Sequence, residues 1–307
     1  MSKNEFLPFG SAANANVLPN ADYQALPARS AGFGSGVAKS EELNTVWRQS
    51  STMAAVLGQF LANKTGQDVL DNGNVEALLG QLESAILSAS PGRLINIQTF
   101  TSSGAYTPTP GTKRILVEVQ GAGGGGGGAG STSSSTYSAG GGGTAGGYAM
   151  SLLDINENKI VSVSVMVGIG GAGGSGSPTG GSSGGDSKFG TYVVAKGGNA
   201  SLTQAPIAGA FTITGTYGGD ASGGNIINRR GDNSGSVICT EGLIIAGEGG
   251  SSKFGAGGVG FASWNSNGRD AVGEGAGGGG ATSTNSQGAN YRGGNGSGGI
   301  VIIWEYA

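Results

Sequence analysis

Carboxylates are the side chains that could perform acid–base chemistry in the larger, second part of this sequence. Eleven of them follow residue 93: Glu118, Asp154, Glu157, Asp186, Asp220, Asp232, Glu241, Glu248, Asp270, Glu274 and Glu305. A glycoside hydrolase needs only two carboxylates at a suitable separation. None of these forms a recognisable pair in the sequence, and Asp186 and Asp220 are better explained as Asx-type turn residues. We therefore expect no catalytic residues.

Other chemistry is excluded by composition. The chain has no histidine, and Cys239 is its single cysteine. Ser-His and Cys-His nucleophile pairs are impossible, as are His-ligated zinc and a cysteine cluster within one chain. We predict no metal site and no cofactor, and we expect Cys239 to be a small buried apolar side chain.

Charge argues against nucleic acid as a partner. The net charge is −3 and only 11% of residues are charged, so no basic patch is available to neutralise a phosphate backbone. G-x-G-x-x-G patterns arise here from composition alone, and no G-K-[ST] supplies a P-loop lysine. The first ten residues lack the apolar core of a signal peptide, so we expect synthesis in the cytoplasm.

Large side chains between glycine runs are the candidate recognition residues. Trp, Tyr and Arg dominate binding hot spots because each combines broad contact with a hydrogen-bonding group. The predicted receptor-binding residues are Tyr137, Arg229, Arg230, Trp264, Asn265, Arg269, Tyr291 and Arg292. Two alternatives stay open: Trp264 and Phe261 could instead form a small core, and the arginines could be solvated loop charges.

The elements that hold these residues are unusual, because 67 of 307 residues are glycine, and 58 of those glycines follow residue 92. Collagen is excluded because glycine does not recur at every third residue. Simple disorder is disfavoured because the glycine runs are interleaved with strand sequences at residues 94–100, 113–120, 159–167 and 300–306. Repeated runs also make a flexible linker a poor explanation.

A folded alternative is a set of polyglycine II-like helices with three residues per turn. Their backbone N–H and C=O groups point outward, so neighbouring helices can hydrogen-bond at backbone contact distance. Only glycine is small enough for an enclosed position in such a lattice. The fold class we predict is mixed, with a C-terminal β-strand platform and glycine-rich helices packed at backbone contact distance.

The first part of the chain reads differently. Residues 1–38 contain three prolines and show no helical or alternating period, which predicts an extended arm. A helix is predicted from Ser40, with Glu41 and Glu42 in its first turn, and a second helix is capped by Asn74 and ended by Pro91-Gly92. Heptad spacing and a second apolar face predict a short helical bundle formed by self-association, although the spacing alone does not give the number of chains. The residues predicted to form it are Leu43, Val46, Met53, Leu57, Phe60, Leu78, Leu82 and Ile86.

Two stretches carry a family resemblance. SEELNTVWRQSSTMAAVLGQFLANKTGQDVLDNG, at residues 40–73 and preceded by LPFGSAANANVLPNADYQALPARSAGF, resembles the N-terminal part of tail fibre proteins of tailed bacteriophages and their prophage relatives. The second part, from TFTSSGAYTPTPGTKRILVEVQGAGGGGGG to GGNGSGGIVIIWEYA, looks like the glycine-rich C-terminal domain of phage receptor-binding proteins.

The resemblance implies a homotrimeric fibre located in the virion tail, with polyglycine II-like helices packed in a sandwich in its glycine-rich domain. Residues 1–38 would attach to tail or baseplate proteins, residues 39–92 would trimerise, and residues 93–307 would bind a host outer-membrane protein or surface glycan. Related adhesins can be separate monomeric subunits, whereas here the glycine-rich domain is fused to an expected oligomeric base. The sequence also shows no long β-helical shaft, so we expect a short or spike-like fibre. A purely structural tail-tip or baseplate component and a polysaccharide-cleaving fibre are the alternatives.

Overall fold

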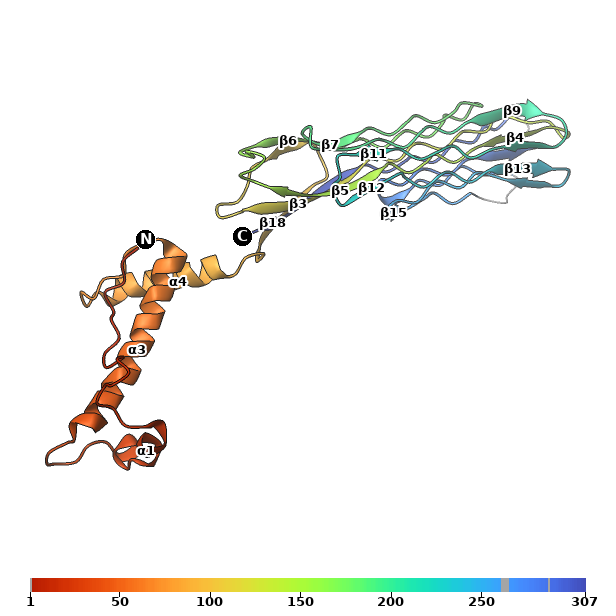
Figure 1. The fold of residues 1–307 in the computed structure, drawn as a ribbon. Coiled ribbons are helices and arrows are strands. Elements are labelled where there is room, and N and C mark those ends of the chain that lie inside the picture. The colour runs from red at the N-terminus through yellow and green to blue at the C-terminus, as the bar shows by residue number, and fades with distance from the viewer. Residues whose placement is uncertain (1, 261–264, 287) are drawn as a thin grey trace. The chain divides into compact units, whose positions relative to one another are not determined.

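The computed structural model describes residues 2–260, 265–286 and 288–307. The chain divides into two compact units, Met1–Pro91 and Gly92–Ala307. The four helices of the described residues belong to the first unit, and the second is built from strands and extended segments (Figure 1). Within the described part of the chain, no helix combines the length and apolarity needed to cross a membrane.

Two helices form the body of the first unit, α3 (Ser40–Thr65) and α4 (Val75–Ala89). The helix predicted from Ser40 is present, although its N-cap is Lys39 and no side chain caps it. Gly66 ends α3 in the left-handed region at φ 70°, and its N–H donates to the carbonyl of Ala62. Asn74 caps α4 as predicted, because its side chain accepts a hydrogen bond from the N–H of Ala77.

The two helices pack through a small apolar cluster. Leu61, Ala62, Val69 and Ala85 are buried in it, and Phe6, Phe60, Leu78 and Leu82 pack against them. Three residues predicted for the trimer, Phe60, Leu78 and Leu82, therefore already contact this cluster within one chain.

Residues 1–38 differ from the extended arm that the sequence suggested. Two short helices, α1 (Asn20–Ala25) and α2 (Ala28–Ala31), form where Pro19 and Pro27 fix φ at −55° and −60° at the N-cap positions. The preceding residues follow α3, where the Leu18 N–H donates to Thr45 Oγ1 at 2.8 Å. The Phe9 ring meets Trp47 edge to face, with centroids 5.9 Å apart.

A two-layer sandwich forms one end of the second unit. Its first sheet has the antiparallel order β1-β18-β3-β5-β12, and its second has the order β11-β8-β7-β6-β2. The first-sheet strands are β1 (Leu94–Phe100), β18 (Ile300–Tyr306), β3 (Arg114–Gln120), β5 (Tyr148–Asp154) and β12 (Ile227–Arg229). The second-sheet strands are β11 (Ala221–Ser222), β8 (Val193–Ala195), β7 (Ser187–Phe189), β6 (Val163–Met166) and β2 (Gly104–Tyr106).

The largest core lies between these two sheets. Ile115, Val117, Val301 and Ile303 point inward from the first sheet and meet Phe189 and its neighbours on the second. Three of the strand sequences recognised above form β1, β3 and β18, which are adjacent in one sheet. The loop between β1 and β3 contains β2, which pairs with β6 in the opposite layer.

Smaller sheets form the remaining strand structure of the unit, with orders β17-β4-β9, β10-β13-β14 and β15-β16. Their strands are β4 (Tyr137–Gly140), β9 (Thr203–Ile207), β10 (Phe211–Ile213), β13 (Val237–Thr240), β14 (Leu243–Ile245), β15 (Phe254–Ala256), β16 (Val272–Glu274) and β17 (Thr282–Thr284). A second core forms where β13 and β14 meet β4, and it buries Cys239 as expected.

Glycine segments connect these two regions of strands, as Figure 1 shows. Residues 121–129 lie in the middle of these glycine segments. Every third N–H group along residues 121–129 donates to the same neighbouring segment. Gly123, Gly126 and Ala129 donate to Ser297, Gly294 and Tyr291; Gly124 and Gly127 to Thr144 and Gly141; Gly125 and Gly128 to Ser182 and Thr179.

The carbonyl groups of residues 122–127 follow the same rule with three other segments. They accept from the N–H groups of Gly171 and Gly174, of Gly278 and Ala281, and of Gly198 and Ser201. Backbone therefore packs directly on backbone: a Cβ atom added to Gly125 would overlap the carbonyl oxygen of Ala172, and one added to Gly126 would overlap that of Gly279.

Candidate recognition site

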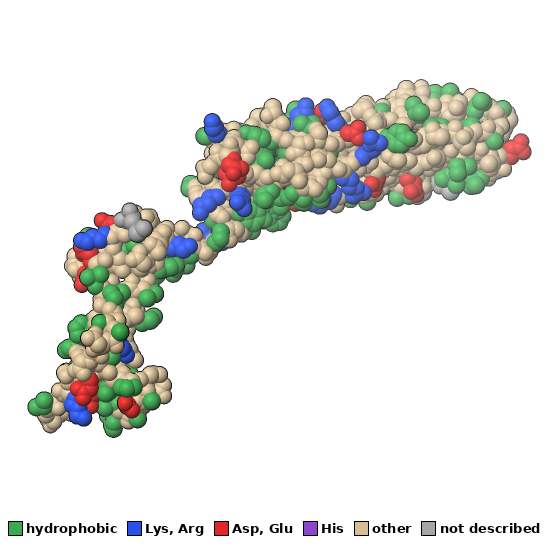
Figure 2. All heavy atoms as spheres, in the orientation of Figure 1, with side chains coloured by type: hydrophobic (Ala, Val, Ile, Leu, Met, Phe, Trp, Pro, Cys, Tyr) green, Lys and Arg blue, Asp and Glu red, His purple; other side chains and the backbone are tan. Residues whose placement is uncertain are grey.

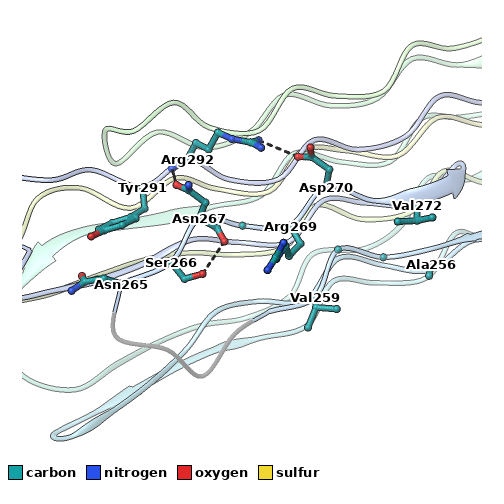
Figure 3. Close-up of a pocket in the computed structure, with 13 residues that line it drawn as sticks. Ala256, Val259, Asn265, Ser266, Asn267, Arg269, Asp270, Val272, Tyr291 and Arg292 are labelled. Carbon is teal, nitrogen blue, oxygen red and sulfur yellow. Dashed lines mark hydrogen bonds and ion pairs between the residues drawn. The ribbon is translucent and has the colours of Figure 1, made fainter.

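A pocket of about 920 Å³ lies on the side of the glycine-rich unit. It is lined by residues from the β15–β16 hairpin, from 257–259 and 265–270, and from Tyr291 and Arg292. Four predicted receptor-binding residues meet here: Asn265, Arg269, Tyr291 and Arg292. Figure 3 shows them around one hollow although they come from two segments of the chain.

Backbone hydrogen bonds fix these residues to the glycine segments. The N–H of Tyr291 donates to the carbonyl of Ala129 at 2.9 Å, and the reverse bond measures 2.8 Å. Asn267 Oδ1 accepts from the Arg292 N–H at 2.9 Å, and Asn265 Oδ1 accepts from the Thr284 N–H at 2.9 Å. Both asparagine side-chain oxygens accept bonds from the backbone, and this fixes the orientation of each side-chain amide, whose NH₂ group is a hydrogen-bond donor.

The lining of the pocket contains an ion pair between Arg292 and Asp270. Arg292 Nη1 lies 3.0 Å from Asp270 Oδ1, an oxygen that also accepts from the Asn295 N–H at 2.7 Å. The hydrogen bond from Arg292, together with that N–H, lowers the pKa of Asp270. Arg269 adds a second guanidinium, so the lining carries two positive charges and one negative charge.

The apolar part of the lining comes from Ala256, Val259 and Val272, of which the two valines are exposed. An exposed apolar side chain beside charged and amide groups suits a ligand that has both apolar and polar faces. Sequence reasoning missed these residues as well as Asn267 and Asp270. For Asn267 and Asp270 the sequence held one signal, because they lie on both sides of Arg269 within a run that carries large side chains.

Three further predicted recognition residues, Tyr137, Arg229 and Arg230, lie elsewhere. Tyr137 begins β4 and packs against the core that contains Cys239. Arg229 pairs with Asp232 at 2.7 Å. Arg230 pairs with Asp220, also at 2.7 Å, and stacks over the Tyr217 ring at 5.6 Å. None of the three lines the pocket, and Trp264 lies outside the described residues.

A second polar cluster sits within the first sheet. Glu118 accepts hydrogen bonds from Tyr148 at 2.7 Å, from Trp304 Nε1 at 3.2 Å and from Lys253. Burial alone would raise the pKa of Glu118, but the bonds from Lys253 and Tyr148 outweigh it, so the net pKa is lowered. The cluster neutralises a buried carboxylate and ties three strands to residue 253.

Residues predicted for trimerisation divide into two groups. Phe60, Leu78 and Leu82 contact the helix cluster described above, and Leu43 and Val46 are half-buried. Met53, Leu57 and Ile86 keep 69%, 47% and 52% of their surface exposed.

The described residues contain no group of three or more acidic or cysteine side chains arranged to hold a metal ion.

A family model described as a glycine-rich domain matches residues 100–304, a range that includes the pocket and nearly all of the second unit. No curated protein matches the chain.

Proposed function

We propose that this chain, which belongs to the family of glycine-rich domains, is the tail-fibre adhesin of a tailed bacteriophage or prophage and recognises the host surface through its glycine-rich unit. The observation that carries the proposal is the pocket that gathers Asn265, Arg269, Tyr291 and Arg292. An adhesin needs a surface that presents large side chains from a rigid support, because preorganised groups lose little entropy on binding.

In this proposal the glycine segments are polyglycine II helices packed in a lattice. Support comes from the period of three in the hydrogen bonds of residues 121–129, since a helix with three residues per turn points every third N–H in the same direction. Such a lattice supplies the rigid support. The pocket side chains project from segments that are bonded into this support, because the Gly268 N–H donates to the carbonyl of Arg292 and the Ala271 N–H to that of Asn295.

The active form in the proposal is a homotrimer held by the first unit, with residues 1–38 attaching the fibre to the phage tail. Support comes from the exposed apolar side chains of α3 and α4, including Met53, Leu57 and Ile86. Large apolar side chains grouped on a helix face commonly mark an interface. A trimer presents three pockets, so avidity multiplies a modest affinity of each.

Cell binding by the purified chain tests the proposal. Fluorescently labelled protein is screened against a panel of bacterial strains, and a strain that binds is then tested with Arg269→Ala, Tyr291→Ala and the matched control Tyr217→Ala. We expect at least tenfold weaker binding for the two pocket variants, with unchanged thermal unfolding, and wild-type binding for the control.

Two results would contradict the proposal. If no strain binds the chain, the structural tail-component role is favoured instead. If both pocket variants bind like the wild-type chain, recognition lies on a different surface. Release of saccharide from lipopolysaccharide or capsule would favour the polysaccharide-cleaving alternative.

A further inference from the structure

The first sheet of the glycine-rich unit is apolar on both faces. Its inner face packs on the second sheet, and its outer face carries Ile97, Trp304, Leu116 and Leu152, which the strand register places side by side across four strands. The next row places Ile302, Met150 and Ile227 beside Glu118. Sheets with one solvated face normally alternate apolar and polar residues.

These seven apolar residues, here called the outer patch, form a continuous surface. Neighbouring strands lie about 4.8 Å apart, so a row of four strands is about 14 Å wide. In Figure 2 hydrophobic side chains gather along the lower border of this unit, where Figure 1 places β3 and β18. A surface of this kind, rimmed by polar groups, is typical of a protein interface.

The charges around the outer patch are already neutralised. Glu118 is bonded to Lys253, Tyr148 and Trp304, and at the other end Arg114 lies 3.8 Å from Asp154. Covering this face therefore leaves no unpaired charge among these groups, which removes the main cost of burying them.

Chain connectivity identifies what covers the patch. Only residues 90–93 separate the end of α4 from the start of β1, and four extended residues reach at most about 14 Å. If the helices trimerise, as the proposed function requires, three copies of β1 are tethered close together. A short tether gives an effective concentration near the millimolar range, at which a modest apolar surface associates.

We infer that the outer patches of three copies of this chain pack against one another, so that the trimer interface continues from the helices into the glycine-rich unit. This inference rests on the proposed trimer but makes a separate claim about the first sheet. It also assigns a role to the β18 run IVIIWEY, whose alternate residues Ile302 and Trp304 face away from the core.

Cysteine accessibility in the full chain tests the inference. Leu152→Cys and Ile97→Cys place thiols at two sides of the outer patch, at residues that are 40% and 43% exposed in one chain. Ile169→Cys is the exposed reference, because Ile169 follows β6 of the opposite layer and is 84% exposed, about twice as much as the patch positions in one chain. The wild-type chain, whose Cys239 is buried, gives the background of maleimide labelling.

We expect the native chain to sediment as a trimer and both patch cysteines to react at least tenfold more slowly than Cys at position 169, with equal rates in denaturant. A trimer in which either patch cysteine reacts as fast as the exposed reference would overturn the inference and leave the trimer intact. A monomer would overturn the proposed trimer and the inference together.

Discussion

Gly125 shows most directly why this unit needs glycine. Its N–H donates to Ser182, and a Cβ atom at this position would overlap the carbonyl oxygen of Ala172. Gly125→Ala should therefore destabilise the unit by about 1–3 kcal/mol or more, because the neighbouring backbone leaves no space for a methyl group. Thermal and urea unfolding measure the change.

Gly298→Ala is the control for that substitution. A Cβ atom at Gly298 would meet its nearest neighbours at 3.6 and 3.7 Å, which is ordinary contact. We expect its stability to stay within about 0.5 kcal/mol of wild type, as for most surface substitutions. Equal stability of the two variants would argue that residues 121–129 are a loose linker.

Glu305 provides a pH-dependent contribution to stability. The residue is buried and accepts bonds from Tyr106 at 2.8 Å and from Thr109 N and Oγ1 at 3.0 and 2.6 Å. Burial alone would raise the pKa of Glu305, but the hydrogen bonds from Thr109, Tyr106 and Gln98 outweigh it and lower the pKa from 4.5. The stabilisation is therefore complete above about pH 4.5 and is lost as pH falls through the folded-state pKa.

The expected result for Glu305→Gln follows from the lowered pKa of Glu305. At pH 7 the variant should lose about 1.5–3 kcal/mol of unfolding free energy, the range for hydrogen bonds to a charged group. The difference from wild type should shrink as the pH falls through the lowered pKa of Glu305, because the wild-type carboxyl then becomes protonated. Urea unfolding at a series of acidic pH values and at pH 7 is the measurement, and a difference that stays constant over the series would show that the charge of Glu305 does not matter.

At the scale of elements, the start of α4 offers a small and specific test. Asn74 Oδ1 accepts from the Ala77 N–H at 3.0 Å and so satisfies one of the free donors at the helix end. Asn74→Ala should cost about 1 kcal/mol, whereas Asn74→Asp keeps an acceptor and should cost less. Circular dichroism during urea unfolding measures the stability of both variants. If both unfold like the wild-type chain, the cap does not contribute to stability.

Local signals explain which elements the sequence predicts well. Both long helices begin and end near cap, glycine or proline residues, and β1, β3 and β18 are apolar runs of strand length. The strand β5 escaped prediction because YAMSLLD follows directly on glycine runs and has weak alternation. Residues 20–31 became helical because Pro19 and Pro27 preset the backbone at two helix starts.

The pairing of segments could not be predicted, and this limited the prediction of the site. Glycine runs are nearly identical to one another, so the sequence does not say that residues 123–129 pair with 291–297. That pairing, with the bond between Gly268 and Arg292, brings Arg292 beside Asp270. Residue types identified four pocket members, but only the backbone pairing of distant segments separates them from Arg229 and Arg230.

At the scale of the whole molecule, the proposed trimer requires the exposed apolar face of the helices as its interface. Leu57→Asp should dissociate or misfold the assembly, because an unpaired charge in an interface costs several kcal/mol. Gln49→Asp places the same side chain at an exposed polar position of α3 and should leave the mass unchanged. Analytical ultracentrifugation distinguishes a particle of three 29.8 kDa chains from a monomer. Identical sedimentation of wild type and both variants would argue against this interface.

The central claim, that the glycine-rich unit is the outward-facing end of a tail fibre, is tested most directly by immunogold electron microscopy of the phage particles. One antibody is raised against residues 2–91 and the other against residues 92–307. We predict that both label the tail, with the second antibody farther from the capsid and able to block adsorption. Absence of tail label, or the glycine-rich unit lying nearer the capsid than the helices, would contradict the account.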